Sequence, residues 1–198
     1  RREADRLIEQ GLVFVNGELA QMGMQVNDND EIMIEGKNLK VKKERVYLML
    51  NKPKGITSTT DSKVKGNIKD YVNYHELIFP IGRLDKDSTG LILLTNDGDI
   101  VNKILREEHG HEKEYLVTVD KALTIDFLKE MAEGITIYNP VRHGYQKTAK
   151  ATLKRVDDFS FTIIIKQGLN RQIRRMCRAL GYYVRELQRI RIMDLQLG

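Results

Sequence analysis

Gly82-Arg83-Leu84-Asp85-Lys86-Asp87-Ser88-Thr89-Gly90 is a charged stretch bounded by glycines, and the apolar run Leu91-Ile92-Leu93-Leu94 follows it directly. The apolar run predicts a buried strand, so the charged stretch reads as the loop that leads into it. Within this loop, Asp85 stands between the basic residues Arg83 and Lys86. Nearby positive charges favour the ionised form of a carboxylate, which predicts an ionised, positioned Asp85 close to a bound polyanion.

Three interpretations of this loop compete. As a polar turn, Asp87 or Ser88 would cap local backbone groups. As a calcium loop, residues 85, 87, 89 and 90 would fall at positions 1, 3, 5 and 6 of an EF-hand, but Asn96 at position 12 cannot supply the bidentate carboxylate. As a catalytic site, Asp85 would need partner residues from elsewhere in the chain.

The composition sets the class of protein. The chain has 198 residues, of which 41% are hydrophobic, enough for one sizeable core and a small appended module. No apolar run approaches the ~18 residues of a membrane span and no secretory signal is visible, so we expect a cytoplasmic protein without a membrane partner. Cys177 is the only cysteine, and His109-x-His111 has no third ligand at metal spacing, so we expect no metal site.

The positive charge is concentrated near the C-terminus. The net charge is +5, yet residues 166–191 hold eight basic residues against Glu186 alone, which gives this segment +7 and the remainder −2. A patch of this kind is typical of a surface that binds a phosphate backbone, and arginine suits bidentate phosphate contacts. A solvated helix face is the alternative, which the charge asymmetry disfavours.

Two units are expected along the chain. Residues 1–36 predict a small unit with a helix over 2–10, strands over 12–15 and 32–34, an extended segment from Val26 and a turn over 28–30. Arg1, Arg2 and Arg6 cluster at its start, where they are candidate RNA contacts. The polar residues 37–45 predict a linker, and residues 46–198 predict the larger unit.

The larger unit mixes strands and helices without regular alternation. This pattern favours an α+β fold with a largely antiparallel mixed sheet and flanking helices. The expected strands are 47–50, 77–81, 91–95, 114–119, 148–156, 160–166, 182–188 and 190–197, and the expected helices are 67–74, 99–106, 124–133 and 170–180. On the last helix, Cys177 belongs to an apolar stripe, which predicts a core residue and not a nucleophile.

Asp85 has candidate partners in two places. Tyr115 lies on a predicted strand, where its phenol would stack on a base or carry a proton. Four arginines follow the spacing i, i+3, i+4, i+7 and would share one helix face. One of the four would hold Asp85 ionised, but spacing does not decide which one. They are Arg171, Arg174, Arg175 and Arg178.

Several motifs, in order along the chain, resemble the bacterial pseudouridine synthases of the small-subunit-rRNA type. They are Leu50-Asn51-Lys52-Pro53-Lys54-Gly55, Gly82-Arg83-Leu84-Asp85 with Asp87-Ser88-x-Gly90-Leu91, Lys113-Glu114-Tyr115, and Gln167-Gly168-x-Asn170-Arg171-Gln172-Ile173-Arg174-Arg175-Met176. Within that family the chain is most similar to the branch with Gly-Leu-Asn-Arg-Gln-Ile-Arg-Arg, which modifies a uridine in 23S rRNA and can act on tRNA. Residues 1–36 resemble an S4 RNA-binding domain that lacks its first helix.

The resemblance implies the pseudouridine synthase fold with a central cleft, and isomerisation of a uridine in structured RNA without a cofactor. The expected substrate is 23S rRNA first and tRNA second, and the target base would be flipped out of its stack. Asp85 would be the nucleophile, Tyr115 the general base and Arg174 the partner that keeps Asp85 ionised. The residues expected to contact RNA are Arg83, Lys86, Gln167, Asn170, Arg171 and Arg175.

Two alternatives have different chemistry. A non-catalytic RNA-binding ribosome assembly factor would need the basic helix and the N-terminal unit but not Asp85. An aspartyl phosphotransferase would use Asp85-x-Asp87 with Mg²⁺. For the isomerase we expect a monomer.

Overall fold

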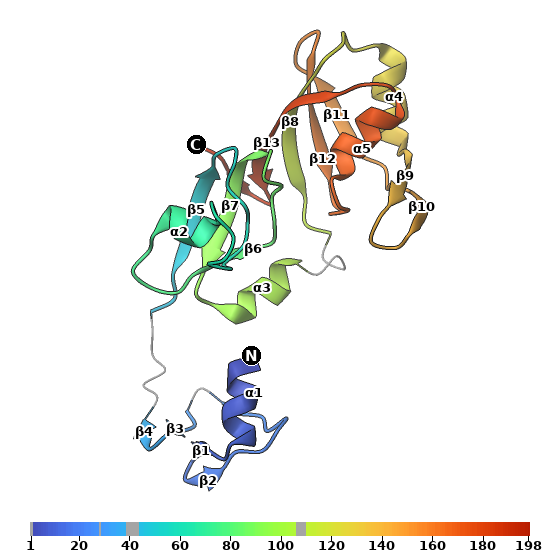
Figure 1. The fold of residues 1–198 in the computed structure, drawn as a ribbon. Helices are drawn as coiled ribbons and strands as arrows, with labels where there is room; N and C mark the ends of the chain where they lie inside the picture. The colour runs from blue at the N-terminus through green and yellow to red at the C-terminus, as the bar shows by residue number, and fades with distance from the viewer. Residues whose placement is uncertain (1, 28, 39–43, 106–109) are drawn as a thin grey trace. The chain divides into compact units, whose positions relative to one another are not determined.

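The computed structural model describes residues 2–27, 29–38, 44–105 and 110–198. The chain forms two compact units, Arg1–Glu44 and Arg45–Gly198. Figure 1 shows both units, and each is described by itself below.

The N-terminal unit is a helix with a small antiparallel sheet. Helix α1 (Arg2–Glu9) precedes four short strands in the order β2-β1-β3-β4. Val13 and Val15 face a small core, which the partly buried side chains of Leu7, Ile8 and Ile32 complete. The strands are β1 (Val13–Val15), β2 (Glu18–Leu19), β3 (Ile32–Ile34) and β4 (Lys37–Asn38).

Two predictions for this unit need correction. The predicted linker starts too early, because Lys37 and Asn38 form β4 and pair with β3. Glu35 and Gly36 make this possible, since their positive φ angles of 49° and 73° form a tight turn that reverses the chain. No strand forms at Val26. The rest of the predicted linker, residues 39–43, and Asp28 lie outside the described residues.

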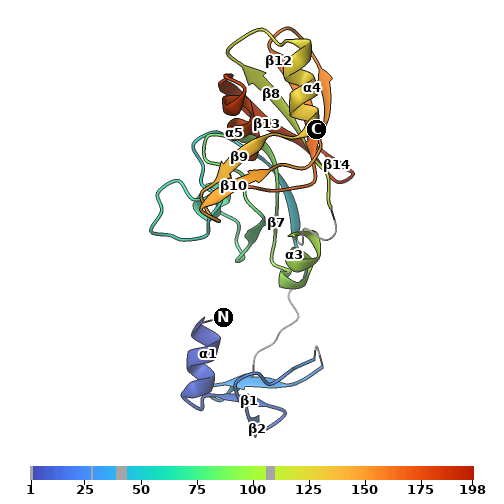
Figure 2. The same ribbon diagram turned by 90° about the vertical axis from the view of Figure 1, so that its right-hand side faces the viewer.

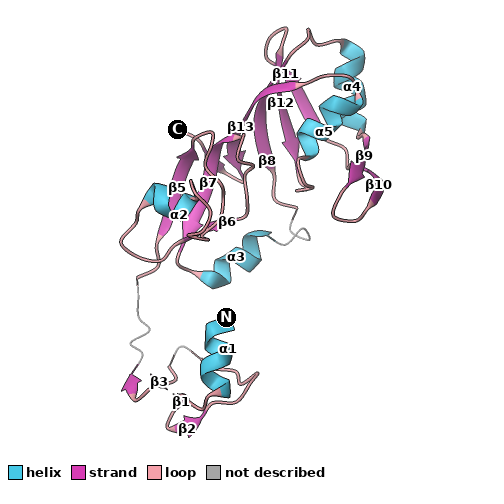
Figure 3. Cartoon of the chain, viewed as in Figure 1, coloured by secondary structure: helices cyan, strands magenta, loops and turns pink. Residues whose placement is uncertain are grey.

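The larger unit is built on an eight-stranded mixed sheet. The strand order is β11-β12-β8-β13-β7-β5, with β6 paired to β7 and β14 paired to β13. Figure 3 shows these strands with the helices beside them. The strands are β5 (Tyr47–Lys52), β6 (Phe79–Ile81), β7 (Thr89–Thr95), β8 (Lys113–Val119), β11 (Thr152–Arg155), β12 (Ser160–Ile165), β13 (Val184–Ile192) and β14 (Leu195–Gln196).

The pair β7–β13 joins the two halves of this sheet. It is the parallel pair of an otherwise antiparallel sheet, and it sets Gly90 directly opposite Arg189. Gly90 has a φ of 102°, and a Cβ atom built there would lie 2.3 Å from the Arg189 carbonyl oxygen. Only glycine allows the two backbones to approach so closely. The glycine that ends the Asp85 loop therefore fixes that loop to the centre of the sheet.

Two differences from the predicted strands affect the site. Strand β13 runs unbroken through residues 184–192, with irregular pairing near residues 185 and 190, where two separate strands are predicted. Strands β9 (Thr136–Asn139) and β10 (Gly144–Lys147) form a hairpin that the sequence pattern did not indicate. This hairpin lies beside α5 (Figure 2).

Helices α4 and α5 share one core with β8 and β12. Helix α4 begins after its N-cap Thr124, as predicted, and buries Phe127 and Met131. Cys177 on α5 is fully buried, and burial raises the pKa of its thiol to about 12, so its prediction as a core residue is confirmed. The helices are α2 (Ile68–Val72), α3 (Gly98–Leu105), α4 (Ile125–Glu133) and α5 (Gln172–Ala179). None of the helices in the described part of the chain is both long and apolar enough to cross a membrane.

Candidate active site

The Asp85 loop connects β6 to β7 and rests on the turn that follows β5. The Gly55 amide donates to the Lys86 carbonyl oxygen at 2.8 Å. The Ser58 hydroxyl donates to the Leu84 carbonyl oxygen at 2.8 Å and accepts from the Leu84 amide at 3.1 Å. These bonds fix the backbone on both sides of Asp85, so the carboxylate is held by a rigid support.

Lys52 holds the supporting turn in shape, a role that the sequence reasoning missed. Its side chain is fully buried, and its Nζ donates to the carbonyl oxygens of Pro53 and Ile56, each at 2.9 Å. Burial lowers the pKa of this ammonium group, while the negative charges of Asp85 and Asp87 oppose the shift. The position of Lys52 in a basic turn gave no sign that it would be buried.

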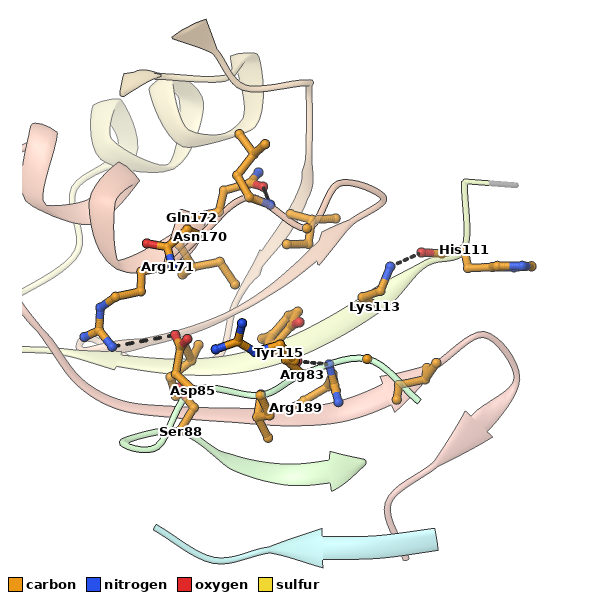
Figure 4. Close-up of a pocket in the computed structure, with 18 of the residues that line it drawn as sticks. Arg83, Asp85, Ser88, His111, Lys113, Tyr115, Asn170, Arg171, Gln172 and Arg189 are labelled. Atoms are coloured by element: carbon orange, nitrogen blue, oxygen red, sulfur yellow. Dashed lines mark hydrogen bonds and ion pairs between the residues drawn. The ribbon is translucent and has the colours of Figure 1, made fainter. Parts of the chain in front are cut away.

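Asp85 faces Arg171, which lies at the start of α5. An Arg171 guanidinium nitrogen lies 3.7 Å from an Asp85 carboxylate oxygen, with the two side chains 40% and 33% exposed. Figure 4 shows the Arg171 side chain reaching toward Asp85. The pair leaves the carboxylate positioned but still open to a ligand.

Asp87 is tied down more tightly than Asp85. Both of its oxygens accept hydrogen bonds from Arg171, at 2.9 and 2.8 Å, and these bonds lower the pKa of Asp87 to about 2. Arg174 adds an ion pair at 3.6 Å and donates to the Asp87 carbonyl oxygen at 3.1 Å. Asp87 therefore anchors the loop to α5, and the calcium interpretation loses its second ligand.

The predicted pairing of Asp85 with Arg174 is wrong in this structure. Arg171 is the N-cap of α5 and adopts left-handed angles, φ 50° and ψ 36°, so it does not continue the helical row of Arg174, Arg175 and Arg178. This turn of the backbone directs Arg171 to both carboxylates of the loop. Arg174 instead contacts Asp87 and the Ser88 hydroxyl.

Asp85 opens on a cleft of about 460 Å³. Tyr115 lies in the cleft wall on β8, only 8% exposed, and pairs across the sheet with Arg189 on β13. Asp85 and Tyr115 thus line one cleft together with Arg171, whereas the predicted partner Arg174 does not line it. The predicted site residues that line it are Arg83, Asp85, Tyr115, Asn170 and Arg171.

Arg189 is a cleft residue that the sequence reasoning counted only as part of the basic patch. It is 4% exposed, its Nε donates to the Leu91 carbonyl oxygen at 2.7 Å, and one terminal nitrogen donates to the Arg83 carbonyl oxygen at 3.5 Å. The other terminal nitrogen is buried and has no hydrogen-bond partner among the described residues. Arg189 stands two residues after the buried Leu187 on β13, so both side chains lie on the same face of the sheet. This spacing was the sequence signal that Arg189 is buried.

The remaining predicted RNA contacts are distributed unevenly. Arg83 and Lys86 expose their side chains beside Asp85. Gln167 does not line the cleft, because its side-chain oxygen accepts from the Ala149 amide at 2.8 Å. Arg175 donates to the Tyr138 carbonyl oxygen at 3.0 Å and to Asn170 at 3.1 Å.

The N-terminal unit carries the last three candidate RNA contacts. Arg6 is exposed on α1. Arg1 and the side chain of Arg2 lie outside the described residues.

The cleft combines a positioned carboxylate, a buried phenol and buried guanidinium nitrogens. A carboxylate can act as a covalent nucleophile, and a phenol can carry a proton in the same site. The guanidinium groups supply donors for a planar acceptor or a phosphate. This set of groups suits nucleophilic displacement on a substrate that carries phosphate groups.

Comparison with known proteins assigns the family. The RNA pseudouridylate synthase family matches residues 46–179, and the S4 domain matches residues 1–32. The dual-specificity RNA pseudouridine synthase RluF of Escherichia coli K12 is 51% identical over 200 residues, which cover 100% of this chain and 67% of the relative. The ribosomal large subunit pseudouridine synthase B of Bacillus subtilis is 38% identical, with 96% and 78% covered.

A solved structure agrees with this assignment. A crystal structure of a pseudouridylate synthase matches with a TM-score of 0.73 and 34% identity, covering 100% of this chain and 84% of that chain. The predicted fold class and family resemblance are therefore confirmed. The chain belongs to the RNA pseudouridylate synthase family and is an RNA-modifying isomerase with an S4 domain ahead of its catalytic domain.

Proposed function

We propose that this enzyme converts one uridine of 23S rRNA into pseudouridine and also acts on tRNA. The relative at 51% identity carries the words dual-specificity RNA pseudouridine synthase in its name, and the one at 38% is a large-subunit enzyme. The S4 domain and the basic segment around α5 support a structured RNA as the substrate.

The observation that carries this proposal is the meeting of Asp85 and Tyr115 in one cleft. In the proposed reaction the target base leaves its stack, which costs a few kcal/mol, and enters the cleft. The Asp85 carboxylate attacks C1′ of the ribose, and the bond from C1′ to N1 of uracil breaks. The uracil turns, its C5 displaces the carboxylate from C1′, and the C5 proton leaves while N1 gains one. The product is an isomer of the substrate, so nothing is consumed.

Tyr115 is proposed to carry the proton from C5. It lies on β8 with its ring almost fully buried, so the phenol has a fixed position relative to a base in the cleft. Arg83 is proposed to fill the space that the flipped base leaves, because its side chain is exposed next to Asp85. Lys86 and Asn170 are proposed to hold the sugar and phosphate groups nearby.

The arginines have separate proposed roles. Arg171 positions Asp85 for attack, because it is the cation that contacts this carboxylate. Arg174 keeps the loop closed through Asp87 and Ser88 and serves Asp85 indirectly. Arg6, with Arg1 and Arg2, is proposed to contact RNA from the S4 domain.

We place the activity in the cytoplasm and in a monomer. Ribosomal and transfer RNA are the proposed substrates. The test is site-resolved pseudouridine mapping of RNA from cells that lack this protein, with and without rescue. Loss of one 23S rRNA position, restored by the wild-type gene, would support the proposal. An unchanged map of rRNA and tRNA would overturn it.

A further inference from the structure

A second hollow lies on the other side of Arg171, between the β9–β10 hairpin, α5 and the start of β13. Its volume is about 550 Å³, and Arg171 lines both this hollow and the active-site cleft. Tyr138 and Tyr145 stand opposite each other on the hairpin, with ring centroids 5.5 Å apart. We call the hollow the tyrosine groove. The groove takes Arg171, Arg174 and Arg175 from the last family motif, whereas its tyrosines lie outside all the motifs.

The tyrosine groove presents exposed aromatic rings. Tyr145 is 79% exposed, Tyr183 is 57% exposed and Tyr138 is 42% exposed. Exposed aromatic side chains gathered in one hollow indicate a binding surface, because their apolar faces otherwise remain in water. The hydrogen bond from Arg175 to the Tyr138 carbonyl oxygen ties the hairpin to α5, so the rings are held on a fixed support.

The groove is also positively charged, and part of this charge is uncompensated. Arg171 and Arg174 are paired with the loop carboxylates, but the partners of Arg175 among the described residues are the neutral oxygens of Tyr138 and Asn170. The Nε of Arg175 is buried without a hydrogen-bond partner among the described residues. Arg178 is exposed on the next turn of α5, and the described residues that line the groove include no aspartate or glutamate.

We infer that the tyrosine groove binds unpaired nucleotides that flank the target uridine, an inference that rests on the proposed function. Base faces stack on aromatic rings only when the bases are unpaired, and arginines beside the rings hold the phosphates of the same strand. Tyr145 and Tyr183 supply the stacking faces, while Arg175 and Arg178 face the phosphates. A protein partner is disfavoured, since uncompensated arginines next to exposed rings match a polyanion with planar bases. Arg171 connects this strand to the cleft that holds Asp85.

The test measures binding by the full chain with two fluorescent probes of about twelve nucleotides, a length within the site sizes of single-strand-binding grooves. One probe is oligouridylate, and the other is an abasic strand with the same number of phosphates. Tyr145→Ala should weaken oligouridylate binding roughly five- to 150-fold, the range for loss of one stacked base. It should leave the abasic strand unaffected, because no base is there to stack. Tyr145→Phe should bind both probes as the wild type does.

Two further variants complete the experiment. Arg178→Ala should weaken both probes and lower the slope of log affinity against log salt by about 0.7, the value for one lost phosphate contact to a single strand. Tyr71→Ala, which removes a tyrosine 49% exposed on α2 outside the groove, is the matched control and should change neither probe.

The inference would be overturned if Tyr145→Ala bound oligouridylate as tightly as the wild type. Equal losses on the oligouridylate and the abasic strand, or no binding of oligouridylate by the wild-type chain, would overturn it as well. The readout is binding and not product. A negative result therefore leaves the isomerase assignment intact, and a failed pseudouridine map leaves the binding result intact.

Discussion

Replacing Lys52 by methionine tests how the Asp85 loop is supported. The substitution keeps the length of the buried stem and removes the ammonium group, which donates to the carbonyl oxygens of Pro53 and Ile56 at 2.9 Å. Both carbonyl groups, which belong to half-buried residues, then lose the donor that the fully buried Lys52 supplies. The turn they shape carries the Gly55 amide, whose hydrogen bond holds the Lys86 carbonyl next to Asp85.

The expected magnitude follows from these two bonds. A carbonyl left without a donor costs about 1–3 kcal/mol when it is fully buried, so these two half-buried carbonyls together cost at most about 2–6 kcal/mol. The methionine variant no longer buries the Lys52 ammonium charge, and this offsets part of the cost. The net loss in the free energy of unfolding is therefore about 2–4 kcal/mol. At roughly 2–4 °C per kcal/mol for a chain of this size, Tm should fall by about 4–16 °C.

The assay is urea unfolding of the purified chain at neutral pH, followed by kcat/KM at a temperature where the variant is folded. The midpoint should fall without a change in m, and kcat/KM should fall roughly ten- to 100-fold because the nucleophile moves. Lys54→Met, an exposed lysine in the same turn, is the matched control and should change neither quantity. A Lys52→Met variant within about 0.5 kcal/mol of the wild type would refute the reasoning, since surface substitutions already fall in that range.

Three further predictions concern the loop and the cleft. Gly90→Ala should destabilise the catalytic unit by about 3 kcal/mol in thermal unfolding, because the new Cβ atom would lie 2.3 Å from the Arg189 carbonyl oxygen. The control Gly98→Ala places its Cβ atom in open space and should not destabilise the unit. Equal stability of the two variants would contradict the close approach of Gly90 to Arg189. The pKa of Asp87 is about 2 in the folded chain and 3.8 for an unperturbed aspartate, so the unfolded chain binds more protons than the folded chain between these pH values. The free energy of unfolding of the wild type should therefore fall as the pH is lowered from about 4 to 2. Asp87→Asn should flatten that fall in unfolding midpoints measured against pH. Tyr115→Phe keeps the stacking face and removes the phenol, so RNA binding should persist while turnover falls at least about 100-fold, the contribution of a positioned proton carrier; unchanged turnover would remove Tyr115 from the mechanism.

Much of the fold was predictable because it depends on local patterns. The apolar run of β7, the cap of α4 at Thr124 and the buried stripe with Cys177 all follow from periodicity and capping. The β9–β10 hairpin was not predictable in this way. Its residues, 136–147, have no alternating apolar pattern, and their turn contains His143 at a positive φ of 50°.

The site was predictable in its members but not in its pairings. Ordered motifs identified Asp85 and Tyr115, and the structure brings them into one cleft. Asp85 contacts Arg171 and not the predicted Arg174, because Arg171 adopts left-handed backbone angles at the start of α5. Helical spacing does not indicate such a residue. Lys52 and Arg189 are buried cations held by backbone carbonyls, and which carbonyls face a side chain is decided only by tertiary structure.

If Asp85 is the nucleophile, its carboxylate is required for the release of tritium from C5 of uridine. RNA from cells lacking this protein, labelled with tritium at C5 of uridine, is incubated with wild-type, Asp85→Asn or Asp126→Asn enzyme. Asp126 is an exposed carboxylate on α4 outside the cleft and serves as the control. Wild type and Asp126→Asn should release tritium, whereas Asp85→Asn should bind the RNA and release none above background. Release by Asp85→Asn at the wild-type rate would contradict the role of Asp85 as the nucleophile.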